Sequence, residues 1–421
     1  MDKVLLRKAA TQSVVLMLVV ILMSFYIKQY NEVVISASNN NDENDITDIT
    51  NQQTLPEIDE IAKIDEADEL QIPEEPILVF TGAQNHVSNE VLEQLGEQYL
   101  VIRKPEGGGF QVVLEDYYST RTLRLLISGF MEDLPDNNYI GRVNGDQVFI
   151  GEPSYVETKT FDVEEDGTLS PVITRDYGND PVNGITFTSQ SDEIGHSVYE
   201  IDLQLNNIYV HVLYEDDYYY YIDLKRPKDV YDKIIVIDAG HGGKDPGAIS
   251  KDEHTYEKHI NLKILLELKE LLDKDNIKVY YTRLKDETLF LRPRITIAND
   301  VESDFFISIH CNSNNSNKPN GTEILYCDHV NNNIHTKDLA KIFSEEISKT
   351  ISLKNGGMIK LKDDDVFILE NARIPAIIIE TGYLSNRNDL EYLLKNSSYE
   401  KIAEGIYKGI KRAYEELVPY K

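Results

Sequence analysis

The stretch Ile234-Ile235-Val236-Ile237-Asp238-Ala239-Gly240-His241-Gly242-Gly243-Lys244-Asp245-Pro246-Gly247-Ala248 decides the fold of the C-terminal part of this chain. Its apolar start is typical of a strand buried on both faces of a parallel sheet. The glycines that follow let the backbone and a single histidine approach a ligand closely, at the strand end where open α/β sheets place their sites. Neither spacing of a phosphate-binding loop is present, so the centre of this loop is His241.

Around this stretch, strands and helices alternate from Lys233 to the end of the chain. This alternation predicts an α/β domain over residues 232–421, with a mainly parallel, twisted sheet flanked by helices. We expect strands at Ile234–Asp238, Lys278–Thr282, Phe305–His310, Gly321–Tyr326 and Ala376–Glu380. We expect helices at Glu257–Leu272, Pro293–Asn299, His335–Ile351, Asp389–Lys395 and Ser398–Glu416, with Asn388 and Asp389 supplying caps. The first helix has the clearest apolar stripe, formed by Ile260, Ile264, Leu268, Leu271 and Leu272.

Two further residues complete a candidate metal site with His241. Glu257 opens the first helix, and His310 ends another apolar strand. Alone, Glu257 would most often be a carboxylate that favours a helix N-terminus, and His310 a hydrogen-bonded histidine near the core. Together the three supply two imidazoles and one carboxylate, the ligand set of an open catalytic zinc site.

A carboxylate also ends the isoleucine-rich strand at Ala376–Glu380. Burying that charge costs several kcal/mol unless the group is paired or functional. We therefore interpret Glu380 as the general base of the site.

These segments resemble the zinc-dependent N-acetylmuramoyl-L-alanine amidases of the amidase type 3 family. The matching pieces come in family order: IVIDAGHGGKDPGA (235–248), EKHINL (257–262), RPRITIAND (292–300), DFFISIHCN (304–312) and IPAIIIETGYLSN (374–386). The resemblance implies Zn²⁺ held by His241, Glu257 and His310, with Glu380 catalytic. It departs from the family at Ala239, where proline is common, and at Cys311, where a small residue without a thiol is usual.

The resemblance implies hydrolysis of the amide bond between N-acetylmuramic acid and L-alanine in peptidoglycan. Two alternatives stay open: a zinc peptidase that cuts within the stem peptide, and a non-catalytic envelope scaffold that binds peptidoglycan. Some relatives carry a blocking helix between the second histidine and the glutamate. His310 and Glu380 are only seventy residues apart, so we expect no such insert, and an unidentified activator protein is a candidate partner.

Other histidines and both cysteines have simpler interpretations. The segment HTYEKH (254–259) has neither the HExxH nor the HxxEH spacing, so we expect His254 and His259 at the surface. Cys311 and Cys327 are the only two cysteines, and neither belongs to a CxxC motif. We expect both to be core residues, with the Cys311 side chain pointing away from His310 because strand neighbours face opposite sides.

The N-terminal end predicts a membrane anchor and a tether. Residues 9–27 are nineteen residues without a charge, preceded by a basic end at 1–8, so we expect an uncleaved transmembrane helix with residues 1–8 in the cytoplasm. Residues 28–75 follow; from Ser38 to Glu75 they hold thirteen acidic residues and one lysine, which predicts a disordered linker. The enzyme would then be a single-pass protein of the cell membrane, with its catalytic domain facing the cell wall.

Between linker and catalytic domain, residues 76–228 predict a mainly β domain. We expect strands at Ile77–Phe80, Val148–Ile150, Ile185–Thr188, Tyr199–Leu203, Ile208–Leu213 and Tyr218–Leu224, the last three as a meander, and helices at Asn89–Leu95 and Thr120–Phe130. The alternation and position weakly resemble the AMIN module, a β-sandwich that helps attach amidases to the envelope. The tyrosines Tyr214 and Tyr218–Tyr221 could stack on sugars, but core packing is favoured for at least half of them.

Charge excludes one class of partner. The formal net charge is −31, with only 42 lysines and arginines in 421 residues. Such a chain has little attraction for nucleic acid phosphates, so we exclude nucleic-acid binding.

Overall fold

The computed structural model describes most of the chain after the acidic segment. The described residues are 77–79, 84–85, 91, 93–104, 111–130, 140–163, 169–191, 197–251, 254–331, 333–362 and 366–418. The predicted cytoplasmic end, transmembrane helix and acidic linker lie outside them, as do three of the seven residues of the helix predicted at Asn89–Leu95. Among the helices that are described, none is both long and apolar enough to cross a membrane.

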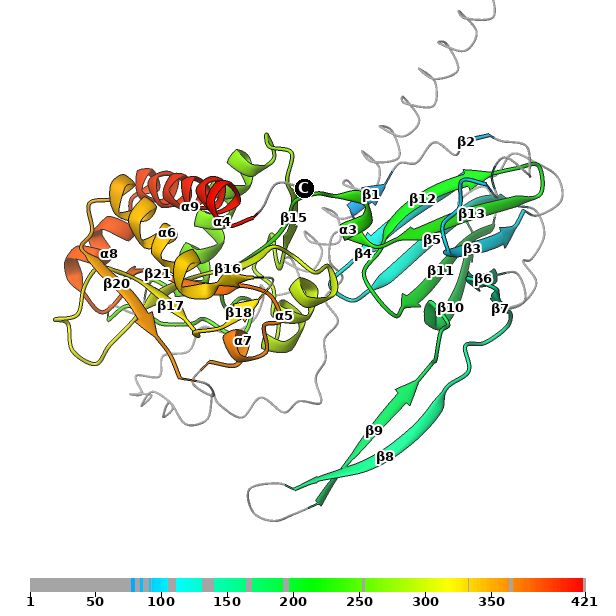
Figure 1. The fold of residues 1–421 in the computed structure, drawn as a ribbon, viewed down its shortest axis with the longest axis horizontal. Helices are drawn as coiled ribbons and strands as arrows, with labels where there is room; N and C mark the ends of the chain where they lie inside the picture. Colours follow the sequence, from blue (N-terminus) through cyan, green and yellow to red (C-terminus); the bar gives the residue numbers. More distant parts are fainter. Residues whose placement is uncertain are drawn as a thin grey trace, which may run out of the picture. The chain divides into compact units, whose positions relative to one another are not determined.

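The region before the catalytic domain is β-rich, as predicted, and forms two facing sheets (Figure 1). One sheet has the order β1 (Ile77–Val79), β4 (Gln111–Tyr117), β5 (Thr122–Phe130), β11 (Ser197–Leu205) and β10 (Val182–Ser191). The other has the order β2 (Gln84–Asn85), β12 (Val210–Glu215), β13 (Tyr219–Lys225), β3 (Gln98–Arg103), β6 (Ile140–Asn144) and β7 (Gln147–Phe149). Their shared core includes Leu125 and Ile201 from the first sheet and Leu100 and Ile222 from the second.

Two sequence predictions for this region are wrong. The helix predicted at Thr120–Phe130 is instead a turn followed by the strand β5 from Thr122, because Leu123, Leu125 and Ile127 alternate toward the core between β4 and β11. The run of leucines, which are good helix formers, obscured that period of two. The last three strands do not form a meander either, because β11 pairs with β5 and β10 in one sheet while β12 and β13 form a hairpin in the other.

The tyrosine cluster is mostly structural, as favoured from the sequence. Tyr214, Tyr220 and Tyr221 are buried, whereas Tyr218 and Tyr219 are exposed. The consecutive tyrosines therefore divide between core and solvent.

A third strand pair stands apart from both sheets. The strands β8 (Val156–Val163) and β9 (Leu169–Asp176) pair antiparallel with each other and with no other described strand. In Figure 1 they form a long ribbon that extends away from the two sheets.

The C-terminal domain is an α/β domain around a six-stranded sheet, as predicted. Its order is β15 (Lys278–Tyr281), β14 (Ile234–Ala239), β16 (Phe305–Asn312), β21 (Ala376–Tyr383), β17 (Thr322–Tyr326) and β20 (Asn355–Lys360). All neighbouring strands are parallel except β17 and β21, so the sheet is mixed but mainly parallel. The exposed edge strand β20 is absent from the sequence prediction because it begins Asn355-Gly356-Gly357, which lacks strand propensity.

Helices cover both faces of this sheet (Figure 1). On one face, α4 (Glu257–Leu272), α6 (Thr336–Thr350), α8 (Arg387–Leu393) and α9 (Asn396–Glu416) pack over alternate strand residues such as Ile237, Ile307 and Ile379. On the other face, α5 (Leu291–Asp300) and α7 (Phe367–Glu370) cover Val236, Phe306 and Ile378. The helix α4 has the predicted ends, although Leu265 rather than Leu271 belongs to its buried side. The N-cap of α8 is Asn386, not Asn388 or Asp389, and its side chain accepts hydrogen bonds from both of those backbone amides.

The β-rich region contacts the edge strand β15 and leads into the C-terminal domain through α3 (Pro227–Val230). The Tyr118 hydroxyl donates a hydrogen bond of 2.6 Å to the carbonyl of Tyr281. The Tyr118 ring also stands edge-on to the Tyr280 ring at a centroid distance of 5.1 Å. Tyr118 therefore ties the β-rich region to the last residue of β15.

Candidate metal and catalytic site

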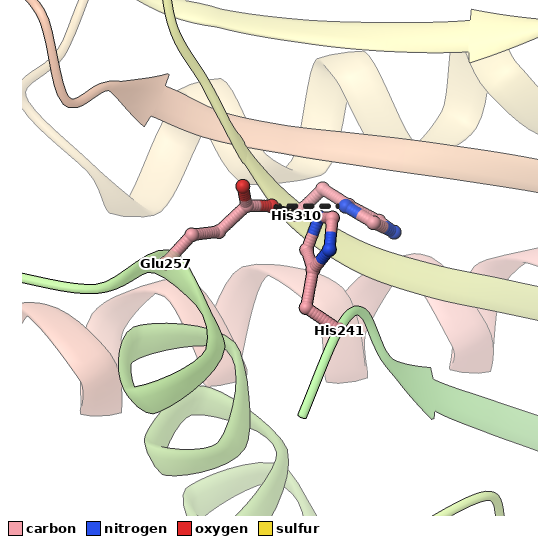
Figure 2. Close-up of side chains that lie close together, drawn as sticks. All are labelled: His241, Glu257 and His310. Atoms are coloured by element: carbon pink, nitrogen blue, oxygen red, sulfur yellow. Dashed lines mark hydrogen bonds and ion pairs between the residues drawn. The ribbon is translucent and has the colours of Figure 1, made fainter. Parts of the chain in front are cut away.

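Three side chains that the sequence singled out meet at the carboxyl ends of the central strands. His241 follows β14, His310 lies near the end of β16, and Glu257 is the first residue of α4. One ligand atom from each lies within 4.8 Å of the others. Figure 2 shows the two imidazoles and the carboxylate converging from these three elements.

Glu257 lies between the two histidines. Its Oε1 is 2.9 Å from His310 Nδ1 and 3.3 Å from His241 Nε2. The two rings are 4.9 Å apart at 80° to each other. A carboxylate with two nearly perpendicular imidazoles in this space is a donor set that can hold a divalent metal ion.

Backbone amides hold the Glu257 carboxylate in place. Cys311 N donates to Oε1 at 2.9 Å and Ala248 N donates to Oε2 at 2.8 Å. Burial alone would raise the pKa of Glu257, but hydrogen bonds and charge from His241 and His310 hold it well below its usual value. The group is therefore an anion, as a metal ligand must be.

Asp245 orients the His241 ring. Its Oδ2 lies 2.7 Å from His241 Nδ1, which leaves Nε2 facing Glu257. Burial would lower the pKa of His241, but the hydrogen bonds to Asp245 and Glu257 raise it to about 9. A carboxylate behind a ligating histidine is the usual device that fixes the ring and raises its basicity. The sequence places Asp245 in the same loop, but four residues of spacing alone do not reveal this contact.

The loop that carries His241 has an unusual backbone. His241 itself has a φ of 62°, in the left-handed region that few residues other than glycine adopt. Gly240 passes so close to His310 that a Cβ there would overlap the imidazole ring. The loop is thus shaped to bring one histidine beside the other.

Gly240→Ala tests that close approach. We expect the added methyl group to displace the His310 ring and to lower metal affinity by about 10- to 100-fold, the usual cost of disturbing the surroundings of a metal ligand. Competition with a chromophoric chelator measures the affinity. Gly184→Ala is the control because its Cβ would meet only Gln204 Cβ at 3.7 Å; equal losses in both variants would contradict the assignment.

Two buried arginines donate hydrogen bonds to backbone carbonyls of the same loop. Arg294 donates to the carbonyls of Ala239 and His241, each at 2.8 Å, and to Asp238 Oδ1 at 2.6 Å. Arg283 donates to the carbonyls of Ala239 and Gly240 at 2.8 and 2.9 Å. Asp238 also accepts from Thr282 and Ser308, both at 2.5 Å. These residues position the ligands, and sequence reasoning missed their role because their partners are backbone carbonyls.

Glu380 lies beside His310 on the next strand. The two residues are register partners in β16 and β21, and Glu323 of β17 is the register partner of Glu380 on its other side. Paired residues of neighbouring strands share a face of the sheet, so these three side chains form one row. The Glu323 carboxylate is held by the Tyr383 hydroxyl at 3.0 Å and by Asn312 Nδ2 at 3.1 Å.

The Glu380 carboxylate has properties expected of an acid–base group. Its Oε2 is buried and has no hydrogen-bond partner among the described residues. Burial raises the pKa of Glu380 to about 7, with the nearby charges of Glu257 and Glu323 adding to the shift and the histidines opposing it. A pKa near neutrality suits a group that must both accept and return a proton. Its catalytic role stays a prediction.

The remaining histidine and cysteine predictions are confirmed. His254 and His259 are exposed and stand outside the metal-ligand group. Cys311 and Cys327 are buried free thiols. The Cys311 sulfur lies 3.2 Å from Thr381 Oγ1 and 3.6 Å from Asn261 Oδ1, and Cys311 is not among the described residues whose ligand atoms converge.

The chain was compared with protein families and with known proteins. Residues 235–412 match the model of the N-acetylmuramoyl-L-alanine amidase family of type 3. The probable cell wall amidase LytH of Staphylococcus saprophyticus is 32% identical over 190 residues, which cover 45% of this chain and 61% of LytH. The germination-specific N-acetylmuramoyl-L-alanine amidase of Bacillus subtilis is 30% identical over 198 residues, covering 44% of this chain and 81% of the relative.

A solved structure is also similar. The catalytic domain of CwlV, an N-acetylmuramoyl-L-alanine amidase from Bacillus (Paenibacillus) polymyxa, is 31% identical, with a TM-score of 0.41; the match covers 44% of this chain and 98% of that domain. The family match lies in the C-terminal domain, which carries His241, Glu257 and His310. This chain therefore belongs to the type 3 family of N-acetylmuramoyl-L-alanine amidases.

Proposed function

We propose that the chain hydrolyses the amide bond between N-acetylmuramic acid and L-alanine in peptidoglycan, with Zn²⁺ held by His241, Glu257 and His310. One observation carries the proposal: the three ligand atoms lie within 4.8 Å of one another in a chain of the amidase family. Two neutral nitrogens and one carboxylate oxygen match the donor preference of zinc in catalytic sites. The buried, unpartnered oxygen of Glu380 in the adjacent register position gives that site an acid–base group.

The metal and the protein side chains have separate roles in the proposed reaction. When bound, zinc would polarise the amide carbonyl and lower the pKa of water towards about 7. Glu380 accepts a proton from the attacking water and returns it to the leaving amine of L-alanine. Asp245 keeps the Nδ1 proton of His241 in place, so that Nε2 stays directed into the site.

Zinc binding is expected to release protons at neutral pH. The pKa of His241 is about 9 without metal, so its ring is protonated at pH 7 and must lose that proton to become a ligand. Zinc affinity should therefore rise with pH, by about tenfold per unit, and level off near pH 9. Calorimetry in buffers of different ionisation enthalpy counts the protons released.

The matched control for this prediction is Asp245→Asn. It removes the charge of one of the two carboxylates that raise the pKa of His241, so fewer protons should be released at pH 8. A zinc affinity that does not change between pH 6 and 9 in the unaltered protein would contradict the prediction.

The bond that is cut separates this function from its alternatives. Digestion of purified peptidoglycan should release intact stem peptides with a free N-terminal alanine, which mass spectrometry of the products detects. Cleavage inside the stem would instead support the peptidase alternative. Binding without products would support the non-catalytic scaffold. A chelator should stop the amidase reaction, and added zinc should restore it.

The site of action follows from the N-terminal sequence. We propose that residues 9–27 anchor the protein in the cell membrane and that residues 28–75 tether the catalytic domain on the wall side. The supporting observations are the uncharged run, the basic residues before it and the acidic composition after it. Protease added to intact spheroplasts should remove the catalytic domain but spare the anchor. Protection of the catalytic domain would contradict this topology.

A further inference from the structure

The β8–β9 ribbon contributes none of the described core residues. The side chains of Val156–Thr160 are all exposed, and Val156 and Ile173 expose 69% and 55% of their surface. A two-stranded ribbon alone is marginally stable in water, and further strands normally complete it. Several exposed residues are β-branched, including Thr158, Thr160 and Thr174, so the sequence retains strand propensity on both faces.

The two edges of the ribbon differ. Pro171 of β9 is the register partner of Phe161 in β8. Proline has no N–H to donate, so it fits a regular ladder where its nitrogen faces away from the paired strand. Pro171 therefore blunts the outer edge of β9, as prolines do on edge strands.

The outer edge of β8 carries no proline. Backbone groups along an antiparallel strand point alternately toward and away from the partner. Pro171 has no N–H, so the Phe161–Pro171 pair is one that exchanges no backbone hydrogen bonds. Such pairs alternate with hydrogen-bonded pairs along an antiparallel ladder, so Lys159–Ile173 and Glu157–Arg175, two and four residues away, exchange none either. The N–H and C=O groups of Glu157 and Lys159 thus point outward from β8.

We propose that two copies of this chain associate through these edges, with β8 pairing antiparallel to β8 of the second copy about Thr158. In this register Glu157 lies opposite Lys159 of the second copy, and the two-fold symmetry repeats the pair. Arg175 already lies 3.6 Å from Glu157 on its other side, so the charges alternate in sign over three strands, from Arg175 through Glu157 to Lys159 of the second copy. On the fourth strand the row ends at Ile173 of that copy. Opposite charges on directly paired strand residues are stabilising.

The neighbouring register is disfavoured. Centring the pairing on Lys159 would place two lysines directly opposite each other, which destabilises a strand pair. Centring the pairing on Thr158 instead places the Thr158 residues of the two copies opposite each other. Thr174 of each copy then lies on the outer side of its own Thr158. The contact involves one eight-residue strand from each copy, so we expect a weak, reversible dimer rather than an obligate one.

A single cysteine tests the axis of this dimer. In the full chain, purified in detergent, Thr158→Cys should form an intermolecular disulfide under mild oxidation, because directly opposed Cβ atoms on paired strands lie about 4.5–5.5 Å apart. Thr174→Cys is the matched control: Thr174 is the register partner of Thr158 but lies on β9, so its copy would be about 14 Å away, across three strand spacings. The native cysteines are buried in both variants. Cross-linking of Thr158→Cys no faster than Thr174→Cys overturns the proposal.

Charge reversal tests the register. Lys159→Glu and Glu157→Lys should each weaken self-association several-fold in sedimentation equilibrium, because each places like charges opposite one another. Mixing the two variants should restore association, since every opposed pair then carries opposite charges. Lysines on edge strands also serve to prevent pairing; if Lys159 does so, Lys159→Glu will not weaken association and the mixture will show no gain, which contradicts the dimer.

Discussion

Glu380→Ala is expected to lower hydrolysis of peptidoglycan by about 10²- to 10⁴-fold, the usual contribution of a general base, while zinc stays bound. The separation follows from the structure, because Glu380 is not one of the three residues whose ligand atoms converge. Release of stem peptides measures the rate, and elemental analysis measures the metal. Hydrolysis by a pure Glu380→Ala preparation at the original rate would remove the residue from the mechanism.

The control for this variant is Glu391→Ala. Glu391 lies exposed on α8, where it pairs with Arg387, so its loss should leave the rate unchanged. The pH profile adds a second readout. A base must be ionised to act, so kcat/KM should rise with pH through the pKa of Glu380, which is about 7 without metal. A bound cation moves that midpoint lower, and the rise should be absent from the Glu380→Ala profile.

Arg294→Met should lower the free energy of unfolding by about 3–5 kcal/mol, the cost of leaving one partner of a buried ion pair uncompensated. Arg294 is 2% exposed and its partner Asp238 is fully buried. Burial would raise the pKa of Asp238, but the Arg294 charge holds it below its usual value. Methionine restores much of the volume but none of the donors, so the carbonyls of Ala239 and His241 lose hydrogen bonds as well.

Arg387→Met makes the same chemical change at an exposed position. Arg387 pairs with Glu391 across one helical turn with its side chain 89% exposed, so its loss should change stability by less than about 1 kcal/mol. Urea denaturation measures both variants. Equal effects would mean that the buried pair contributes no more than a surface pair. A zinc affinity reduced in Arg294→Met alone would further assign this arginine to positioning the His241 loop.

The metal ligands could be predicted because sequence position and strand geometry agree. His241 and His310 end neighbouring parallel strands, which brings them to one edge of the sheet, and Glu257 begins the helix that follows. Asp245, Arg283 and Arg294 could not be assigned from the sequence. Asp245 reaches His241 only because of the loop conformation. The arginines donate to main-chain carbonyls, which every residue has, so the sequence does not mark them as partners.

The β-rich region was predicted less well for a related reason. Strand pairing there connects residues far apart in sequence, and turn positions do not specify which sheet a strand joins. The strand β11 therefore appeared to continue into β12, although the chain crosses to the other sheet between them. Leu123, Leu125 and Ile127 show the same limit, because tertiary contacts outweighed the helix propensity of leucine.

Tyr118 gives the β-rich region a protective role toward its neighbour. The strand β15 is the edge of the catalytic sheet, and Tyr118 caps its last carbonyl and packs on Tyr280. A catalytic domain produced alone, from about residue 232, would lack the contacts of Tyr118 with this strand and would expose its edge to other molecules. Unprotected edge strands recruit strands from other chains, so the shortened protein should aggregate during expression, whereas one beginning before β1 should stay in solution.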